Sequence, residues 1–404
     1  MREPRKWVPL GILVLALAAG VAAFAATTLA GSNKSLAGKP IVIGYSADLV
    51  GRMSPFDTPA LTAAKLEAKR LNAKGGILGH KLVIKVCNTQ DSKPDVAKSC
   101  AANLIGQGAV IGLVTCDVDF ATPAAQEFLN KGELTIAPCI GTDQMGPKRF
   151  GSKGKLAFSV GNVAQDEGAA MAEYAISKGW KKAITVTDNL LVYFRNIVQA
   201  FTVRYKELGG TIVDAESFTS FDKTIGNVVS RVNQQKADVI ATSTGFADWP
   251  AFVSGLRSLN NSTPIMNSWA GDGTFWYPKN PPVTHYWYVT YASVFGDDPD
   301  PAVRALIAKM KAIGQPPATG GFVTGAAAID AIAAAITQAK GSTNGKTLAA
   351  IFVKFHGLPT ISGKISYSPA LHSVFGRAYR VMEVENNTPK FVKLLTTKKL
   401  AKIG

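Results

Sequence analysis

The 404-residue chain is poor in the residues that build metal centres and hydrolytic active sites. Its four histidines are dispersed and form no metal-binding motif: His80, His285, His356 and His372. No Gly-x-Ser-x-Gly nucleophile motif occurs. The segment Gly345–Thr347 imitates the end of a phosphate-binding loop, but Lys340 stands where that motif needs a glycine. These absences predict a protein that is not an enzyme and that uses no metal and no cofactor.

Acidic residues are also few, since 28 Asp and Glu stand against 44 Lys and Arg and leave a net charge of +16. Such an excess is found in nucleic-acid-binding proteins. The basic residues, however, are scattered, and no five of them follow one another. The densest stretch, Lys393–Lys402, is typical of a solvated tail. We therefore interpret the charge as a source of solubility and expect no nucleic-acid partner.

The beginning of the chain has the pattern of an export signal. Basic residues within positions 2–6 precede an uncharged, largely apolar run over 7–33, with small-residue cleavage sites at 23–25 or 28–30. This pattern predicts a signal peptide over residues 1–30 and an exported protein, periplasmic or on the cell surface. The run is also long enough to span a bilayer, so an uncleaved membrane anchor is the alternative.

The four cysteines lie in one part of the chain: Cys87, Cys100, Cys116 and Cys139. They include no Cys-x-x-Cys pair and have no histidine at ligand spacing, which disfavours a zinc site. An even number of cysteines in an exported protein favours disulfides. We therefore expect two disulfide bonds, with all three pairings open.

Apolar strands and amphipathic helices alternate twice along the rest of the chain. The expected strands cover residues 41–45, 82–86, 110–114 and 134–138, then 183–187, 211–217, 239–242 and 264–267. The expected helices cover 58–71, 94–105, 165–178, 192–208, 225–235, 249–259 and 320–340. A loop is expected over 51–57, and a break at Ser159–Val163 separates the two series. This alternation is typical of doubly wound parallel sheets, so the sequence predicts an α/β fold with two lobes.

The stretch Val110–Pro123 has the features of a ligand-binding edge. Its apolar strand ends in a polar segment that contains Asp117 and Asp119. Thr122 and Pro123 offer a helix cap and a first-turn proline, so a helix is expected to begin there. Open α/β folds bind ligands at the carboxyl ends of their parallel strands. We therefore expect half of a solute-binding cleft at this place.

One segment resembles a known family. Residues Leu71–Leu82, with the sequence Leu-Asn-Ala-Lys-Gly-Gly-Ile-Leu-Gly-His-Lys-Leu, closely resemble the first helix end and second strand of the periplasmic leucine/isoleucine/valine-binding proteins. These are the type I solute-binding components of branched-chain amino-acid ABC transporters. The similarity spans roughly residues 40–385, with support from 51–64, 158–168 and 239–259.

The resemblance implies two Rossmann-like lobes joined by three crossovers, which close on a ligand at the hinge. The N-terminal lobe would hold residues 40–160 plus 292–366, and the C-terminal lobe 161–291 plus 367–404. The protein would be a non-catalytic monomer that passes a small molecule to the membrane permease of an ABC importer. A ligand-sensing module of a signalling system, anchored by an uncleaved N-terminal segment, is the alternative. The importer is favoured because no second membrane span or signalling domain precedes Gly404.

The family's carboxylate-binding residues carry over only in part. Its carboxylate-binding serine corresponds to Asp117, whose own charge would repel a ligand carboxylate unless Asp117 is protonated or paired. The next strand edge supplies a small residue, Cys139, and, with a one-residue shift, Thr142. The alternative for Asp117 is a structural role as the cap of the following helix.

Aromatic residues stand at other binding positions of the family. Two of its tyrosines correspond to Phe56 and Phe246, and a third to Tyr193. The acid that binds the ligand's ammonium group corresponds to Trp269, with Asp272, three residues on, as a substitute. Phe56, Phe246 and Trp269 would alternatively be ordinary packing residues.

The resulting prediction for the ligand is a small molecule, amino-acid-like or aromatic and apolar, but not leucine. Together with Trp249, the aromatic residues would form an unusually aromatic cleft. An aromatic or apolar compound with a hydroxyl or cationic group facing Asp117 would fit such a cleft.

Overall fold

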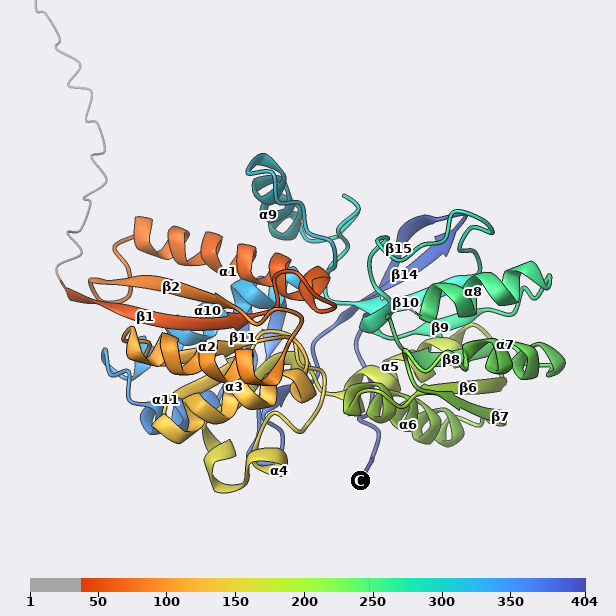
Figure 1. The fold of residues 1–404 in the computed structure, drawn as a ribbon, viewed down its shortest axis with the longest axis horizontal. Coiled ribbons are helices and arrows are strands. Elements are labelled where there is room, and N and C mark those ends of the chain that lie inside the picture. The colour runs from red at the N-terminus through yellow and green to blue at the C-terminus, as the bar shows by residue number, and fades with distance from the viewer. Residues whose placement is uncertain (1–37, 247) are drawn as a thin grey trace, which may run out of the picture. The chain divides into compact units, whose positions relative to one another are not determined.

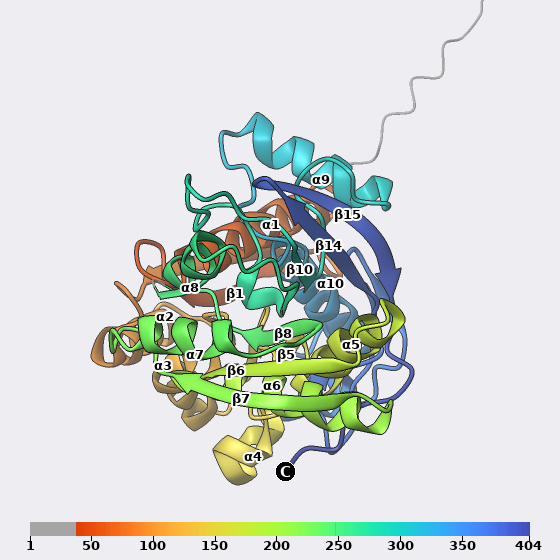
Figure 2. The same ribbon diagram turned by 90° about the vertical axis from the view of Figure 1, so that its right-hand side faces the viewer.

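The computed structural model describes residues 38–246 and 248–404. The expected signal peptide, residues 1–30, lies outside this part of the chain. The described residues belong to one compact unit, which contains two large sheets, each flanked by helices (Figures 1 and 2). Among the described residues, none of the helices has both the length and the apolar character needed to cross a bilayer.

The first sheet is parallel throughout and has the strand order β13-β5-β4-β3-β1-β2. Its strands are β1 (Gly38–Ala47), β2 (His80–Asn88), β3 (Ile111–Val114), β4 (Leu134–Ala137), β5 (Ala157–Asn162) and β13 (Ser373–Val374). Every residue of β3, β4 and β5 is buried. Strands covered on both faces favour continuous apolar runs, as in β3.

Helices cover both faces of this sheet. They are α1 (Ser54–Ala73), α2 (Pro94–Gly106), α3 (Val118–Lys131), α4 (Pro147–Phe150), α10 (Phe322–Gln338) and α11 (Gly345–Phe352), with the 3₁₀ helix η1 (Gly151–Leu156). α1 packs against α10, and α2 packs against α3. Gly112 lets α3 lie directly on β3, because a Cβ at this position would come within 2.4 Å of the Phe128 ring.

The second sheet has the order β15-β14-β10-β9-β8-β6-β7. Its strands are β6 (Lys182–Asp188), β7 (Thr211–Phe218), β8 (Val239–Ser243), β9 (Ile265–Asn267), β10 (Tyr286–Thr290), β14 (Tyr379–Glu385) and β15 (Thr388–Leu395). The two last strands join antiparallel at one edge. The helices after β5 and up to α10 are α5 (Ala164–Ser177), α6 (Val192–Glu207), α7 (Ile225–Gln234), α8 (Asp248–Ser258), the 3₁₀ helix η2 (Trp269–Gly271) and α9 (Pro301–Ala312).

The chain passes between the two sheets three times. The crossings lie between β5 and β6, between β10 and β13, and between β13 and β14. β11 (Leu358–Thr360) and β12 (Gly363–Ile365) form a short hairpin. This hairpin comes just before β13 in the chain. The predicted α/β fold of two lobes and three crossovers is confirmed. The segment 367–404, which we assigned to the second lobe, begins with β13 in the first sheet before β14 and β15 join the second.

Two helices begin earlier than expected. α1 starts at Ser54, so residues 54–57 of the expected loop are helical. α3 starts at Val118 rather than at Thr122, because the Asp117 carboxylate accepts hydrogen bonds from the backbone N–H groups of the first turn. The prediction of a helix start at Thr122 was therefore wrong, since Asp117 caps the helix in its place.

Most of the expected break at Ser159–Val163 belongs to the buried strand β5, and the chain leaves the first sheet after Asn162. Two polar side chains of this strand are bonded inside the fold. The Ser159 hydroxyl donates to the Ile140 carbonyl at 2.7 Å, and the Asn162 amide donates to the Arg377 carbonyl at 3.1 Å. The pattern also missed β10, α9, α11 and the β14–β15 pair.

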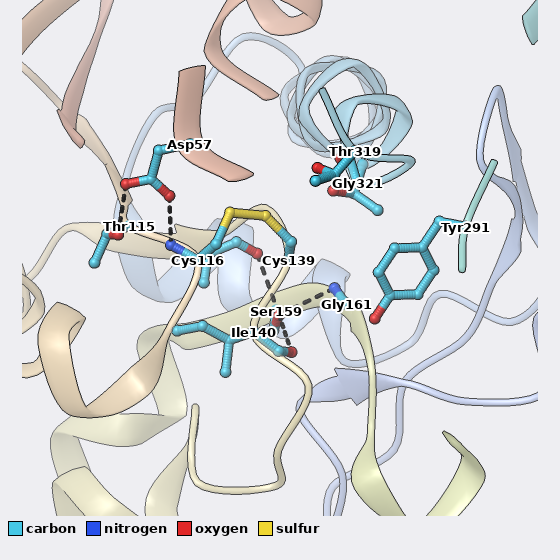
Figure 3. The surroundings of a disulfide bond; sticks show 12 residues. Asp57, Thr115, Cys116, Cys139, Ile140, Ser159, Gly161, Tyr291, Thr319 and Gly321 are labelled. Carbon is cyan, nitrogen blue, oxygen red and sulfur yellow. Dashed lines mark hydrogen bonds between the residues drawn. A yellow bond between two sulfur atoms is a disulfide. The ribbon is translucent and has the colours of Figure 1, made fainter. Parts of the chain in front are cut away.

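The four cysteines form two disulfides, which confirms the prediction and settles the pairing. Cys87 of β2 is joined to Cys100 of α2, with 5.5 Å between the Cα atoms. Cys116 and Cys139, which follow β3 and β4, are joined with 4.8 Å between the Cα atoms (Figure 3). The second bridge therefore links two neighbouring strand ends at the expected binding edge.

We predict that removing the second bridge lowers stability without changing the fold. A disulfide that closes a loop of this length, 23 residues apart, contributes roughly 3 kcal/mol through the unfolded chain. The Cys116→Ala/Cys139→Ala protein should lose about that much unfolding free energy, measured by urea denaturation. Peptide mapping of the unreduced protein should show only the Cys87–Cys100 and Cys116–Cys139 links, and any other linked pair would contradict the assignment.

Candidate functional site

The carboxyl edge of the first sheet is organised by Asp57, a fully buried residue of α1 (Figure 3). Its Oδ2 accepts hydrogen bonds from the Thr115 hydroxyl at 2.5 Å and the Asp48 backbone N–H at 2.7 Å. Its Oδ1 accepts one from the Cys116 N–H at 2.9 Å. Asp57 therefore joins the start of α1 to the segments that follow β1 and β3. The Thr115 hydroxyl is directed to Asp57.

Asp117 lies next along this edge and has two roles in the structure. Its Oδ1 caps α3 by accepting the N–H of Asp119 at 2.8 Å and that of Phe120 at 3.3 Å. The residue also lines a cavity, and burial, together with the neighbouring charge of Asp119, raises the pKa of its carboxyl to about 7. The capping alternative is thus present in the structure together with a place at the cavity wall.

The cavity lies between the two lobes and is narrow, with a water-accessible volume of about 20 Å³, little more than one water molecule needs. The first lobe contributes Met53, Phe56, Cys116 and Asp117. The second lobe contributes Leu191, Tyr193, Phe194, Gly245, Phe246, Trp269 and Ala270. Most of these side chains are apolar, and none is basic. A concave apolar site with few polar groups is the usual form of a small-molecule site.

Aromatic rings form most of the cavity wall. The Phe56 and Trp269 rings meet edge to face with centroids 5.0 Å apart, and the Phe194 and Phe246 rings do so at 5.6 Å. These geometries are the favoured ones for aromatic pairs and hold the rings in place. The Tyr193 ring crosses to the first lobe and lies on Gly141, where a Cβ would come within 2.4 Å of it.

Direct contacts join the two lobes beside the cavity. The backbone N–H of Val192, the first residue of α6, donates to Asp119 Oδ2 at 2.8 Å. The Thr142 hydroxyl donates to Asn196 Oδ1 at 2.9 Å. The Arg52 guanidinium of the first lobe lies 5.1 Å from the centroid of the Phe221 ring of the second lobe. The lobes are therefore held together on the side where the cavity lies.

A family model described as periplasmic binding protein matches residues 40–389. The chain belongs to the periplasmic binding protein family. The Leu/Ile/Val-binding protein BraC3 of Rhizobium johnstonii is 24% identical over 346 residues, which are 82% of this chain and 88% of the relative.

Two solved structures illustrate the shared fold. One is the branched-chain amino acid transporter substrate binding protein LivJ of Streptococcus pneumoniae in complex with isoleucine, with 18% identity and a TM-score of 0.74, over 88% of this chain and 99% of that one. The other is a solute binding protein of an ABC transporter from R. palustris in complex with benzoate. It has 17% identity and a TM-score of 0.73, over 90% of this chain and 99% of that one. These likenesses confirm the type I periplasmic binding protein fold.

Family membership also confirms several functional predictions. The protein is an exported, periplasmic solute-binding protein for small molecules, and it is not an enzyme.

Within the part of the chain that the structure describes, no group of three His, Cys, Asp or Glu side chains is placed to hold a metal ion.

The structure brings five of the eight predicted ligand-binding residues of this periplasmic binding protein to the cavity. They are Phe56, Asp117, Tyr193, Phe246 and Trp269. Whether they bind a ligand stays a prediction, but their meeting from both lobes is what a shared site requires. Trp249, expected in the same aromatic cleft, lies instead in the core of the second lobe, stacked on Phe252 with centroids 5.2 Å apart.

The other three predicted residues do not line the cavity. Cys139 is joined to Cys116, and Thr142 bonds Asn196 across the lobes. Asp272 is buried beside β10, where its Oδ2 accepts the Thr290 hydroxyl at 2.7 Å.

Sequence reasoning missed several lining residues and one acid behind the wall. Leu191 and Phe194 come from the turn into α6, where the apolar segment 190–194 follows a polar strand end and so gave a signal. Glu167 of α5 gave no sequence signal, because nothing in the sequence distinguishes it from a surface residue of an amphipathic helix. It is fully buried, and burial, with Asp166 nearby, raises the pKa of its carboxyl to about 8.

We predict that the protein is most stable on the acidic side of neutrality. Asp117 and Glu167 have native pKa values of about 7 and about 8, whereas unfolded carboxyls titrate near ~4. Between these values the native state keeps protons that the unfolded chain has lost, so raising the pH favours unfolding. The unfolding free energy in urea should therefore fall as the pH rises from 5 to 8.

Two variants check the cause of this slope. Glu167→Gln removes one of the titrating groups and should make the slope shallower. Asp222→Asn should leave it unchanged, because hydrogen bonds from Thr224 lower the pKa of this exposed carboxyl and it is fully ionised above pH 5. A stability that increases from pH 5 to 8 in the unaltered protein would contradict the assignment.

Proposed function

We propose that this protein is the solute-binding component of an ABC importer and that it holds an aromatic or apolar small molecule in the cavity between its lobes. The observation that carries this proposal is the cavity wall, in which Phe56, Phe246 and Trp269 face one space from both lobes. Such rings favour a flat apolar ligand, which they can contact edge to face or by stacking.

The polar part of the ligand is proposed to be a hydroxyl or a cationic group. No Lys or Arg is among the lining residues, so the side chains offer no counter-charge to a ligand carboxylate. Asp117 offers carboxyl oxygens, which accept hydrogen bonds. The indole of Trp269 lines the cavity at the position where the resemblance implies an ammonium-binding acid. An amino acid would therefore leave its two charged groups poorly satisfied, and leucine is not the proposed ligand.

We predict that a screen by thermal shift will select aromatic compounds over aliphatic amino acids, since ligand binding raises apparent stability. The panel is leucine, isoleucine, benzamide, benzoate, benzyl alcohol and benzylamine, and titration calorimetry gives the affinities. Phe246→Ala and Trp269→Ala should weaken binding of the best aromatic compound at least tenfold. Phe391→Ala, an aromatic of β15 outside the cavity, is the matched control and should bind normally. Sub-micromolar affinity for leucine would contradict the proposed ligand class.

Binding is proposed to close the lobes about the crossovers and to present the closed form to a membrane permease. The closing contact is the bond from the Val192 N–H to Asp119 Oδ2, which is possible only when the lobes meet. Asp119 is in turn held by Arg149, whose Nη2 lies 2.6 Å from its Oδ1.

We predict that Asp119→Ala favours the open form and weakens binding of the best panel compound roughly tenfold, because closure loses a charge-assisted hydrogen bond worth about 1.5 kcal/mol. Small-angle X-ray scattering should show a smaller radius of gyration when ligand is added to the unaltered protein. Asp95→Ala removes an exposed acid from the first turn of α2 and serves as control. An unchanged radius at saturating ligand would contradict closure. Loss of ligand uptake by cells that lack this protein tests the importer role.

A further inference from the structure

Glu167 connects two parts of the cavity wall that are distant in sequence. It lies in the first turn of α5, directly after the first crossover between the sheets. Its Oε1 accepts a hydrogen bond from the Tyr193 hydroxyl at 2.9 Å and another from the Trp269 backbone N–H at 2.7 Å. A single oxygen thus joins α6 to η2, the two elements that place these aromatic residues at the cavity.

The geometry around this carboxyl fits a neutral acid. Oε1 accepts two hydrogen bonds, which the two lone pairs of a carbonyl oxygen allow. Oε2 is buried and has no hydrogen-bond partner among the described residues. An ionised carboxylate with one bare oxygen in an apolar surrounding would be costly, whereas a protonated acid leaves only one hydroxyl to satisfy. The acceptor oxygen, not a negative charge, is then what Glu167 supplies to the wall.

We propose that Glu167 is a positioning residue that determines ligand specificity. It holds Tyr193 and Trp269 in place at the cavity wall and accepts the hydrogen bond that the Tyr193 hydroxyl donates. This inference rests on the proposed binding function. A tyrosine hydroxyl has one proton, and here it is donated to Glu167. Tyr193 therefore offers a ligand only an acceptor lone pair, so the site selects an aromatic ligand that carries a hydrogen-bond donor, such as an alcohol or an amine.

The test compares two substitutions of Glu167 with a matched control on the same helix. Glu167→Gln keeps an acceptor oxygen at the same place, and Glu167→Leu removes it. Glu173→Leu removes another buried acid of α5, whose partners are Arg204 and the Lys398 N–H and lie outside the cavity. Benzyl alcohol and benzoate are the probes, and urea denaturation reports the stability of each variant.

We expect Glu167→Leu to weaken benzyl alcohol binding at least tenfold and to reduce its preference over benzoate at least fivefold. Glu167→Gln should remain within threefold of the unaltered protein in both. Glu173→Leu should lose stability but keep the preference. A Glu167→Leu protein with unchanged preference overturns the proposal, and so does a Glu167→Gln protein as weak as Glu167→Leu, because the charge would then be the active feature.

A second measurement needs no ligand and separates this proposal from the binding function. Acrylamide quenching of Trp269 is obtained as the difference between each protein and its Trp269→Phe counterpart, since the chain has six tryptophans. Quenching should increase at least twofold in Glu167→Leu and in Tyr193→Phe, which keeps the ring but breaks the bond to Glu167. Unchanged quenching in both overturns the positioning role, even if no panel compound binds. Tyr193→Phe also serves if Glu167→Leu does not fold.

Discussion

The binding edge of the first lobe depends on the buried carboxyl of Asp57. Three donors from two strand ends, the Thr115 hydroxyl and the N–H groups of Asp48 and Cys116, converge on it. Each would be left buried without a partner if the carboxyl were removed, and such a group costs about 1–3 kcal/mol. This sum exceeds what any one surface ion pair of the molecule contributes. Asp57 therefore fixes the ends of β1 and β3, and with them the position of Asp117 and of the Cys116–Cys139 bridge.

The place of the site could be predicted from the sequence because periodicity and strand-end polarity are local properties. The apolar run before Thr115 fixed β3, and its position at a sheet edge indicated the cleft. What could not be predicted depends on contacts between distant segments. Ser159 lies in β5 because the Ile140 carbonyl, from the segment after β4, satisfies its buried hydroxyl. Asp117 and Thr122 are both good caps by type, and only the backbone decides that Asp117 is used.

The aromatic and acidic groups of the cavity illustrate the same division. A resemblance to a family could place Trp269 at the site, because it maps one position onto one position. It gave no account of Glu167, which reaches the wall from α5 and contacts Trp269 across 102 residues of sequence. An acid on one element has thus been paired with the backbone N–H of a tryptophan on another. The pairing exists only in three dimensions, so a residue-by-residue transfer along the chain misses it.

The balance of energies then decides what kind of ligand such a wall favours. Burying roughly 150 Å² of an aromatic ring contributes about 4 kcal/mol. Burying a carboxylate without a cation or convergent donors costs at least several kcal/mol, which cancels that gain. Asp117, with burial raising its pKa to about 7, does not supply a cation in either protonation state. A ring with a donor group keeps the apolar gain and can donate a hydrogen bond to the carboxyl of Asp117, which lines the cavity, and for this reason the proposed ligand combines the two.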